Sequence, residues 1–281
     1  MNCILKKSLR FFLVFSFCAV YADTAFGQNE FEAELQKKTD SLMYTDHGVR
    51  DVLYPNSVLQ SLTIPSGWGG YGTYIFGGIG GDYRQPYRQT ADLISFAGFC
   101  IGDPQKFVNL AFSINNTDVS NIGNFSGNLT ISRHVFTGSS ISIGALQMFA
   151  DRRVSDSPGY TVYFAFSHAI QSLLSLDQRS SKLSYTVGIG TGRFYKKSPM
   201  DVLNGKGKYG TGIFAGLSYE TLKWMNVNLE WSGMNLGCSL GIKPLNAPLA
   251  IGLGITNLTR YSADKPNLSF AVSYPLSLKR N

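Results

Sequence analysis

From about Tyr71 to its end, the sequence repeats one pattern that restricts the fold more than any other feature. Segments of roughly ten residues alternate large apolar residues with small or polar ones, and turn-rich segments separate them. In the segment 107–116, for example, Val108, Leu110 and Phe112 alternate with small or polar neighbours. Because the side chains of a strand alternate between its two faces, the pattern predicts strands with one apolar and one polar face.

About twelve segments fit this description and are predicted to be strands. They are 71–79, 92–102, 107–116, 124–135, 139–149, 159–170, 182–192, 209–220, 224–233, 236–243, 247–257 and 267–278. A soluble β-sandwich also alternates, but its inward residues are apolar, whereas the second set here consists mainly of small and polar residues. The predicted fold is therefore all-β: a transmembrane antiparallel up-and-down β-barrel of about 12 strands.

A membrane helix is not a good alternative for this chain. Beyond residue 27 the sequence has no run of about twenty apolar residues, the length that a spanning helix needs. Since lipid cannot satisfy backbone N–H and C=O groups, a closed barrel is the other structure that can span it.

The first 27 residues have the organisation of a signal peptide for export through the Sec pathway. Positive charges within 6–10 precede the apolar run 11–20, which is too short to span a bilayer. Small residues after this run predict cleavage before Gln28, with cleavage after Ala22 as the alternative.

The mature chain is predicted to have two parts. Residues 28–66 begin with a stretch rich in Glu and Lys, and Pro55 and Asn56 interrupt any regular element. We interpret this part as a periplasmic lead-in or as a partial plug of the barrel. The barrel itself is predicted to occupy residues 67–281.

The predicted connections alternate in length. Those after odd-numbered strands are mostly long and those after even-numbered strands mostly short, with exceptions at 233–235 and 171–181. Barrels of bacterial outer membranes have short periplasmic turns and longer extracellular loops. The asymmetry predicts an N-terminus in the periplasm and long connections outside the cell.

Basic residues gather in the long connections of this chain, whose formal net charge is +7. Such residues attract anionic solutes to a pore mouth or contact the phosphates of lipopolysaccharide, and the sequence leaves both roles open. No nucleic-acid partner is expected for an exported chain. The candidate pore-mouth residues are Arg84, Arg88, Arg152, Arg153, Arg193, Lys196 and Lys197.

The inward faces of the predicted strands carry few charges. Small inward residues leave space for a pore, but they also allow an occluded lumen. The candidate lumen-lining residues are Asn128, Ser132, His134, Lys182, Glu220, Asn228 and Glu230.

With these features the chain resembles the Gram-negative outer-membrane β-barrel proteins, porin-like but of an uncharacterised family. In the last strand, Ser269, Ala271, Tyr274 and Leu276 resemble the terminal assembly signal of such barrels, with Ala271 where glycine is usual. The resemblance implies an outer-membrane location. It also implies contact with outer-membrane lipid and lipopolysaccharide, and assembly by the barrel-assembly machinery.

Ser132 and His134 are the sharpest candidates for catalysis. They lie two residues apart on one predicted strand and are similar to the serine–histidine arrangement of outer-membrane phospholipases, in reversed order. However, Leu129 and Ile131 occupy the lipid-facing positions, so Ser132 and His134 are expected to face the lumen. We therefore predict that the chain is not an enzyme, with no catalytic, cofactor-binding or metal-binding residues and no cofactor.

The function predicted from the sequence is a narrow diffusion channel for small solutes with a modest anion preference. The alternative is a non-conducting structural, adhesive or assembly barrel with an occluded lumen. A lipid-modifying outer-membrane enzyme is the third interpretation.

Overall fold

The computed structural model describes residues 52–88, 90–119, 122–151, 160–176, 178–244 and 247–278. The chain divides into two compact units, residues 1–51 and 52–281, and all described residues belong to the second. The predicted signal peptide and the first part of the predicted lead-in therefore lie outside the described residues.

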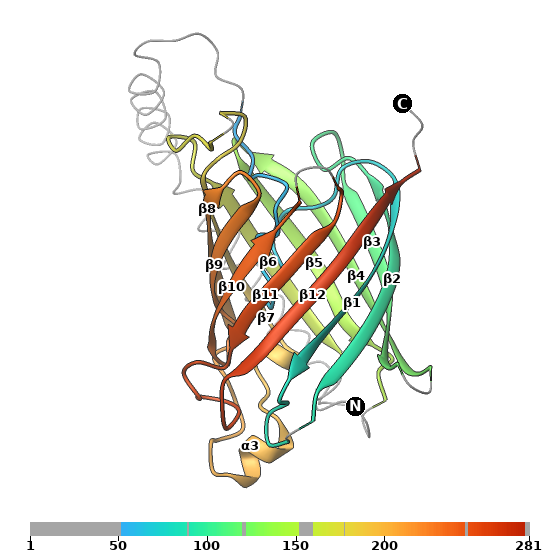
Figure 1. Ribbon diagram of the computed structural model, residues 1–281, viewed down its shortest axis with the longest axis vertical. Coiled ribbons are helices and arrows are strands. Elements are labelled where there is room, and N and C mark those ends of the chain that lie inside the picture. The colour runs from blue at the N-terminus through green and yellow to red at the C-terminus, as the bar shows by residue number, and fades with distance from the viewer. Residues whose placement is uncertain are drawn as a thin grey trace, which may run out of the picture. The chain divides into compact units, whose positions relative to one another are not determined.

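Twelve antiparallel strands form one closed barrel, in which each strand pairs with its neighbours in sequence and β1 pairs with β12 (Figure 1). This confirms the predicted fold class. The strands are β1 Tyr74–Tyr83, β2 Asp92–Gly102, β3 Asn109–Asp118, β4 Gly123–Phe136, β5 Ser139–Met148, β6 Thr161–Ala169, β7 Leu183–Gly190, β8 Ile213–Leu222, β9 Met225–Trp231, β10 Leu236–Ile242, β11 Ala250–Thr256 and β12 Asn267–Ser277. Two short helices, η1 Gly192–Phe194 and α3 Pro199–Leu203, lie between β7 and β8.

The first strand begins and ends later than the predicted 71–79. Its second half is rich in glycine, which carries no side chain and therefore shows no alternation. Glycine at position 78 allows neighbouring groups to approach the backbone closely. A Cβ on Gly78 would lie 2.3 Å from the carbonyl oxygen of Val272 and 2.5 Å from the ring of Phe96. This stretch pairs with both β12 and β2.

The two faces of the strands differ as the alternation predicts. Along β8, Ile213, Leu217 and Tyr219 are exposed on the outside of the barrel, whereas Ser218 and Glu220 are buried inside it. An outward apolar surface around a polar interior is the arrangement of outer-membrane barrels. In the part of the chain that the structure describes, no helix is long and apolar enough to cross a membrane.

The barrel has two different ends. The end that carries α3 holds the connections after odd-numbered strands, and the opposite end, where β12 finishes, holds the connections after even-numbered strands (Figure 1). We refer to them as the α3 end and the C-terminal end.

Candidate functional site in the barrel lumen

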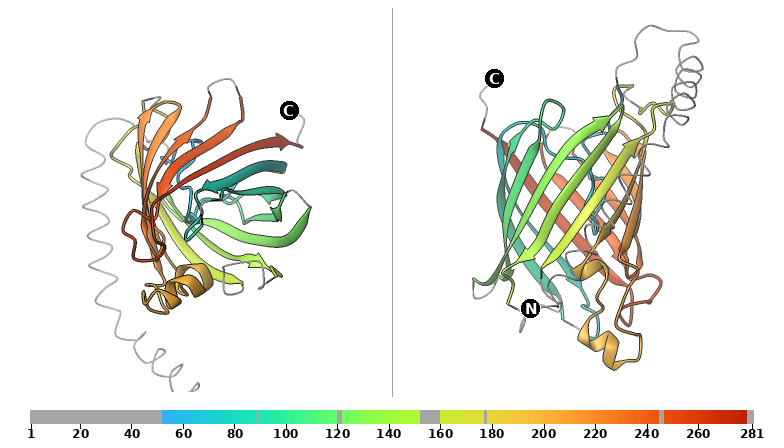
Figure 2. Two further views of the ribbon diagram at one scale, coloured as in Figure 1. Left: turned by 60° about the horizontal axis from the view of Figure 1, so that its bottom comes forward. Right: turned by 180° about the vertical axis from the view of Figure 1, so that it is seen from behind.

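A stretch of chain before β1 lies inside the barrel, and we call residues 52–71 the lumenal segment (Figures 1 and 2). Near the C-terminal end, the backbone N–H of Leu53 donates to the side chain of Gln171 at 2.9 Å. Farther along, the side chain of Asn56 donates to the amide oxygen of Asn226 at 2.9 Å. These contacts hold the segment against polar groups of the barrel.

Glu230 on β9 holds the turn of the lumenal segment. Its carboxylate accepts hydrogen bonds from the backbone N–H groups of Leu62 and Thr63, both at 2.7 Å, and from the Thr63 hydroxyl at 2.7 Å. The hydroxyls of Ser61 and Ser239 also donate to it, at 3.1 and 2.9 Å. Glu230 is only 2% exposed. A carboxylate buried to this extent requires such partners, because an unpaired buried charge is strongly destabilising.

The returning part of the segment contacts the opposite wall through Gly67. Its N–H donates to the hydroxyl of Ser167, and its carbonyl oxygen accepts from the hydroxyl of Ser140, both at 2.7 Å. A Cβ at this position would lie 2.4 Å from the backbone oxygen of Ser140. Glycine is therefore required for this close approach.

A small apolar cluster supports the same region. Ile64 of the lumenal segment packs with Tyr163, Phe194 and Phe214, which are all buried. The rings of Phe194 and Phe214 lie 4.6 Å apart. The lumen therefore contains a packed core as well as polar contacts.

A cavity of about 350 Å³ lies between the segment and the strands β1 and β3–β6. Asn109, Ser113, Asn128 and Thr130 contribute polar groups to its lining. The segment therefore leaves part of the lumen unfilled.

His134 lies in an aromatic cluster near the C-terminal end. Tyr54 stacks on its imidazole at 4.5 Å, and the rings of Trp68 and Tyr71 meet it edge-on at 5.9 and 5.6 Å. The Tyr71 hydroxyl lies 3.2 Å from its Nε2. Desolvation of the Tyr71 phenol, followed by the charge of a neighbouring tyrosine, raises its pKa to about 12. The hydroxyl of Ser132 is buried and has no hydrogen-bond partner among the described residues.

Besides His134, five of the candidate lumen residues lie in or beside these contacts. Asn128 lines the cavity, and Ser132, Glu220, Asn228 and Glu230 are buried. Lys182 differs from its predicted position: its Nζ lies 5.2 Å from the ring centroid of Tyr219, whose side chain is exposed on the outside of the barrel. It lies just before β7, where the strand alternation that placed it inside no longer applies.

The candidate pore-mouth residues separate into three groups. Arg84, Arg88 and Lys196 are exposed. Lys197 and Arg193 make contacts that the sequence does not reveal. Two further candidates, Arg152 and Arg153, lie outside the described residues.

Lys197 is 5% exposed and is tied to the surrounding backbone. Its Nζ donates to the carbonyl oxygens of Lys206 and Tyr261 at 2.7 and 2.8 Å, and it lies 3.4 Å from the centroid of the Tyr261 ring. Burial lowers the pKa of this ammonium group. Lys197 is therefore a structural cation of the loops and is not free at the mouth.

Arg193 lies in η1, with the acidic groups of β1 and β9 in its surroundings. Desolvation lowers the pKa of its guanidinium group, and the charges of Asp82 and Glu230 oppose this lowering. Its side chain is nevertheless exposed, like those of Arg84 and Lys196, and its guanidinium carbon lies 5.8 Å from the centroid of the Phe194 ring.

Asp201 of α3 joins three connections at the α3 end. Its carboxylate accepts from the hydroxyl of Tyr87 at 2.6 Å, from the hydroxyls of Ser262 and Ser198, and from the N–H of Ala263 at 2.7 Å. Burial alone would raise the pKa of this carboxyl group, but these hydrogen bonds outweigh it and hold the pKa below its usual range.

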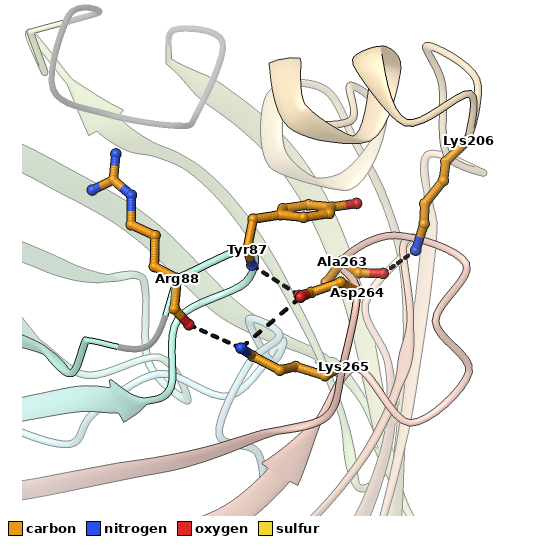
Figure 3. A network of polar contacts seen from close by, with 6 residues as sticks. All are labelled: Tyr87, Arg88, Lys206, Ala263, Asp264 and Lys265. Atoms are coloured by element: carbon orange, nitrogen blue, oxygen red, sulfur yellow. Dashed lines mark hydrogen bonds and ion pairs between the residues drawn. The ribbon is translucent and has the colours of Figure 1, made fainter.

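A second set of contacts joins the same three connections (Figure 3), in which Lys206 of the β7–β8 connection donates to the backbone oxygen of Ala263. The N–H of Tyr87 donates to Asp264 at 2.8 Å. Lys265 donates to the backbone oxygen of Arg88 at 2.9 Å and lies 3.9 Å from Asp264. The connections β1–β2, β7–β8 and β11–β12 therefore form one cross-linked loop cluster.

One serine–histidine pair was missed by the sequence analysis. The hydroxyl of Ser139 on β5 lies 2.7 Å from Nδ1 of His168 on β6. The two residues are cross-strand partners in the register, and His168 shares the outward parity of Phe164 and Phe166. Because they are far apart in the sequence, only knowledge of the strand register could have revealed them.

No family model and no curated protein sequence matches the chain. Among solved structures, the chain is similar to outer membrane phospholipase A from Escherichia coli and to an active-site mutant of that protein. In both cases the identity is 10%, the match covers 83% of this chain and 95% of the other, and the TM-score is 0.39.

The prediction that the chain is not an enzyme is corrected, because the pair of Ser139 and His168 is a serine–histidine candidate that the exclusion left out. The exclusion had rested on the inward parity of Ser132 and His134, and it did not consider residues paired across strands. No cluster of three or more potential metal ligands occurs among the described residues.

Proposed function

We propose that the protein is a narrow diffusion channel for small solutes in the outer membrane, and that the lumenal segment sets its width. A barrel of twelve strands lies between small barrels filled by side chains and open porins of about 16–18 strands. What occupies the lumen therefore decides whether such a barrel conducts.

The observation that carries the proposal is the one-sided placement of the turn of the segment. Glu230 on β9 and Asn226 on the same strand bind it, while the cavity remains beside β3 and β4. A segment held in this way narrows the lumen and leaves unfilled space beside β3 and β4.

A modest preference for anions is part of the proposal. The exposed cations Arg84, Arg88 and Lys196 lie at the α3 end. Fixed charge at a mouth raises the local concentration of counter-ions, and salt screens the effect over about 8–10 Å. The preference is therefore expected to shrink as the salt concentration rises.

Swelling of proteoliposomes tests the channel directly. Purified barrel should admit neutral solutes with a steep decrease in rate as solute size increases. Absence of swelling with folded barrel, judged by its heat-modifiable migration in gels, would favour the non-conducting structural, adhesive or assembly barrel.

Lipid hydrolysis is a second candidate function, favoured by the hydrogen bond between Ser139 and His168. A base within hydrogen-bond distance activates a serine nucleophile, and a third group normally orients that base. Phospholipase assays should compare Ser139→Ala and His168→Ala with Ser132→Ala and His134→Ala. Activity lost only in the first two variants would support catalysis at the outward pair, and an inactive wild type would reject it.

A further inference from the structure

Among the residues that the structure describes, no charged side chain lines the lumenal cavity. The buried carboxylates of the interior, Glu220 and Glu230, are absent from it. Both are already engaged: Glu220 accepts from the N–H of Leu176 at 3.0 Å, and Glu230 binds the segment. An ionic solute in the cavity would thus lose water without gaining a counter-charge, which is costly.

The lining has two kinds of surface. Asn109, Asn128 and Thr130 contribute amide and hydroxyl groups from β3 and β4. Each already has a partner in the protein: Asn109 accepts from the N–H of Gly70, Asn128 donates to Ser113, and the Thr130 hydroxyl lies 2.8 Å from that of Tyr163. Ile64 and Trp68 of the lumenal segment contribute apolar and aromatic groups. A complementary solute has polar groups on one side and an apolar surface on the other.

Two buried polar atoms near the cavity lack a partner among the described residues: Nε1 of Trp68, which belongs to the lining, and Oε1 of Gln147, which does not. Trp68 lines the cavity, and Gln147 is joined to the lining by the hydrogen bond from its N–H to Asn128 at 3.0 Å. One atom is a donor and the other an acceptor. Buried polar groups are normally paired, so these two atoms are exceptions beside the cavity.

The size also indicates a small solute. The volume of about 350 Å³ lies at the lower end of the range for ligand pockets, which is about 300–1,000 Å³. It corresponds to roughly ten times the share of liquid volume of one water molecule.

We infer that this cavity binds a small uncharged solute rich in hydroxyl groups, with the chemistry of a monosaccharide or cyclic polyol. The inference rests on the proposed function, because it names the class of solute that occupies the channel. Hydroxyl groups of the solute meet the polar wall, and the C–H surface of its ring lies against the apolar wall.

The test uses the full-length exported protein in detergent. The chain has three tryptophans, so Trp224→Phe with Trp231→Phe leaves Trp68 as the only indole reporter. D-glucose and myo-inositol are titrated as neutral probes, with glucose 6-phosphate and cyclohexanemethanol as charged and apolar comparisons. Calorimetry on the unmodified protein provides a second readout that does not depend on indole fluorescence.

Three variants locate the site. Ala111 lines the cavity, so Ala111→Phe fills it and should weaken binding at least tenfold. Thr130→Val removes one hydroxyl at nearly constant volume and should weaken binding about three- to tenfold, the usual range for one hydrogen bond. Ser218→Ala removes the bond to Asn228 outside the cavity lining and should leave binding unchanged.

Saturable binding of the neutral probes that is lost in Ala111→Phe would support the inference. No saturable binding to the folded protein, or equally tight binding of glucose 6-phosphate or cyclohexanemethanol, would overturn it. Binding without liposome swelling would reject the channel and keep the site. Swelling without binding would support the channel and reject the binding site.

Discussion

Glu230 accepts a hydrogen bond from the backbone N–H of Leu62 at 2.7 Å, across 168 positions of the sequence. This contact joins the turn of the lumenal segment to the barrel wall. Glu230 is buried and also accepts hydrogen bonds from Ser61 and Thr63. One side chain therefore makes several of the hydrogen bonds that bind the segment to the wall.

Replacement of Glu230 should loosen the lumenal segment. Glu230→Ala removes the acceptor for several donors at once, and hydrogen bonds to a charged group are worth about 1.5–3 kcal/mol each. We expect limited proteolysis to cut the segment at least tenfold faster in this variant. Ser239→Ala, which removes one donor to the same carboxylate from the neighbouring strand, is the matched control and should change the rate little.

Equal cleavage rates in wild type and Glu230→Ala would show that other contacts hold the segment. The contacts of Gly67 with Ser140 and Ser167 would then be the next to replace.

The loop cluster should depend on the ionised form of Asp201. A carboxyl group whose pKa is lowered in the folded state stabilises it above the ordinary pKa of about 4, and this contribution is lost as the pH falls through the lowered value. The protection of α3 against hydrogen exchange, corrected for the intrinsic exchange rate at each pH, should therefore be high at neutral pH and fall only below about pH 4. Asp201→Asn should be destabilised already at neutral pH, by about 1–3 kcal/mol.

Asp264→Asn is the control for this prediction, because Asp264 is less buried and accepts from Tyr87 through a separate bond. A protection factor of α3 that does not change between pH 7 and pH 3 would contradict the role given to Asp201.

Two adjacent lysines should differ in their effect on ion selectivity. Lys196 is exposed, whereas Lys197 is buried against backbone oxygens. Lys196→Glu should shift the reversal potential toward cations at low salt, with a smaller shift at high salt because of screening. Lys197→Gln should leave selectivity nearly unchanged but lower the thermal stability of the loops. If Lys197→Gln changed the ion selectivity more than Lys196→Glu, the charge that determines selectivity would lie in the loop cluster.

The orientation of the barrel remains a prediction, and an epitope tag tests it. Asn204 and Gly205 lie at the exposed end of α3, and a side chain on Gly205 would meet open space. Insertions at such tips are tolerated. A tag between them should be detected on intact cells. Detection only after permeabilisation would place the α3 end in the periplasm.

Alternation in the sequence was sufficient to predict the twelve strands, because inward and outward residues meet different surroundings. It placed β1 too early, because the glycines around Gly78 carry no side chain that could show a pattern. The positions of Lys182 and Lys197 were harder to predict, since both lie outside strands and their contacts depend on how the connections fold.

Contacts distant in sequence limited the prediction of the site. The role of Glu230 depends on backbone N–H groups of the lumenal segment, which every residue except proline has, so the sequence carries no signal for it. The pair formed by Ser139 and His168 depends on the register between β5 and β6. The alternation of side chains within a single strand revealed only the pair formed by Ser132 and His134, which lie two residues apart.

Single-channel recording of wild type and Glu230→Ala in planar bilayers tests the central claim most directly. We expect small, steady conductance for the wild type and larger, fluctuating conductance for the variant, because the released segment no longer narrows the lumen. Equal conductance would contradict the role of the lumenal segment. Absence of conductance from both folded proteins would contradict the channel itself.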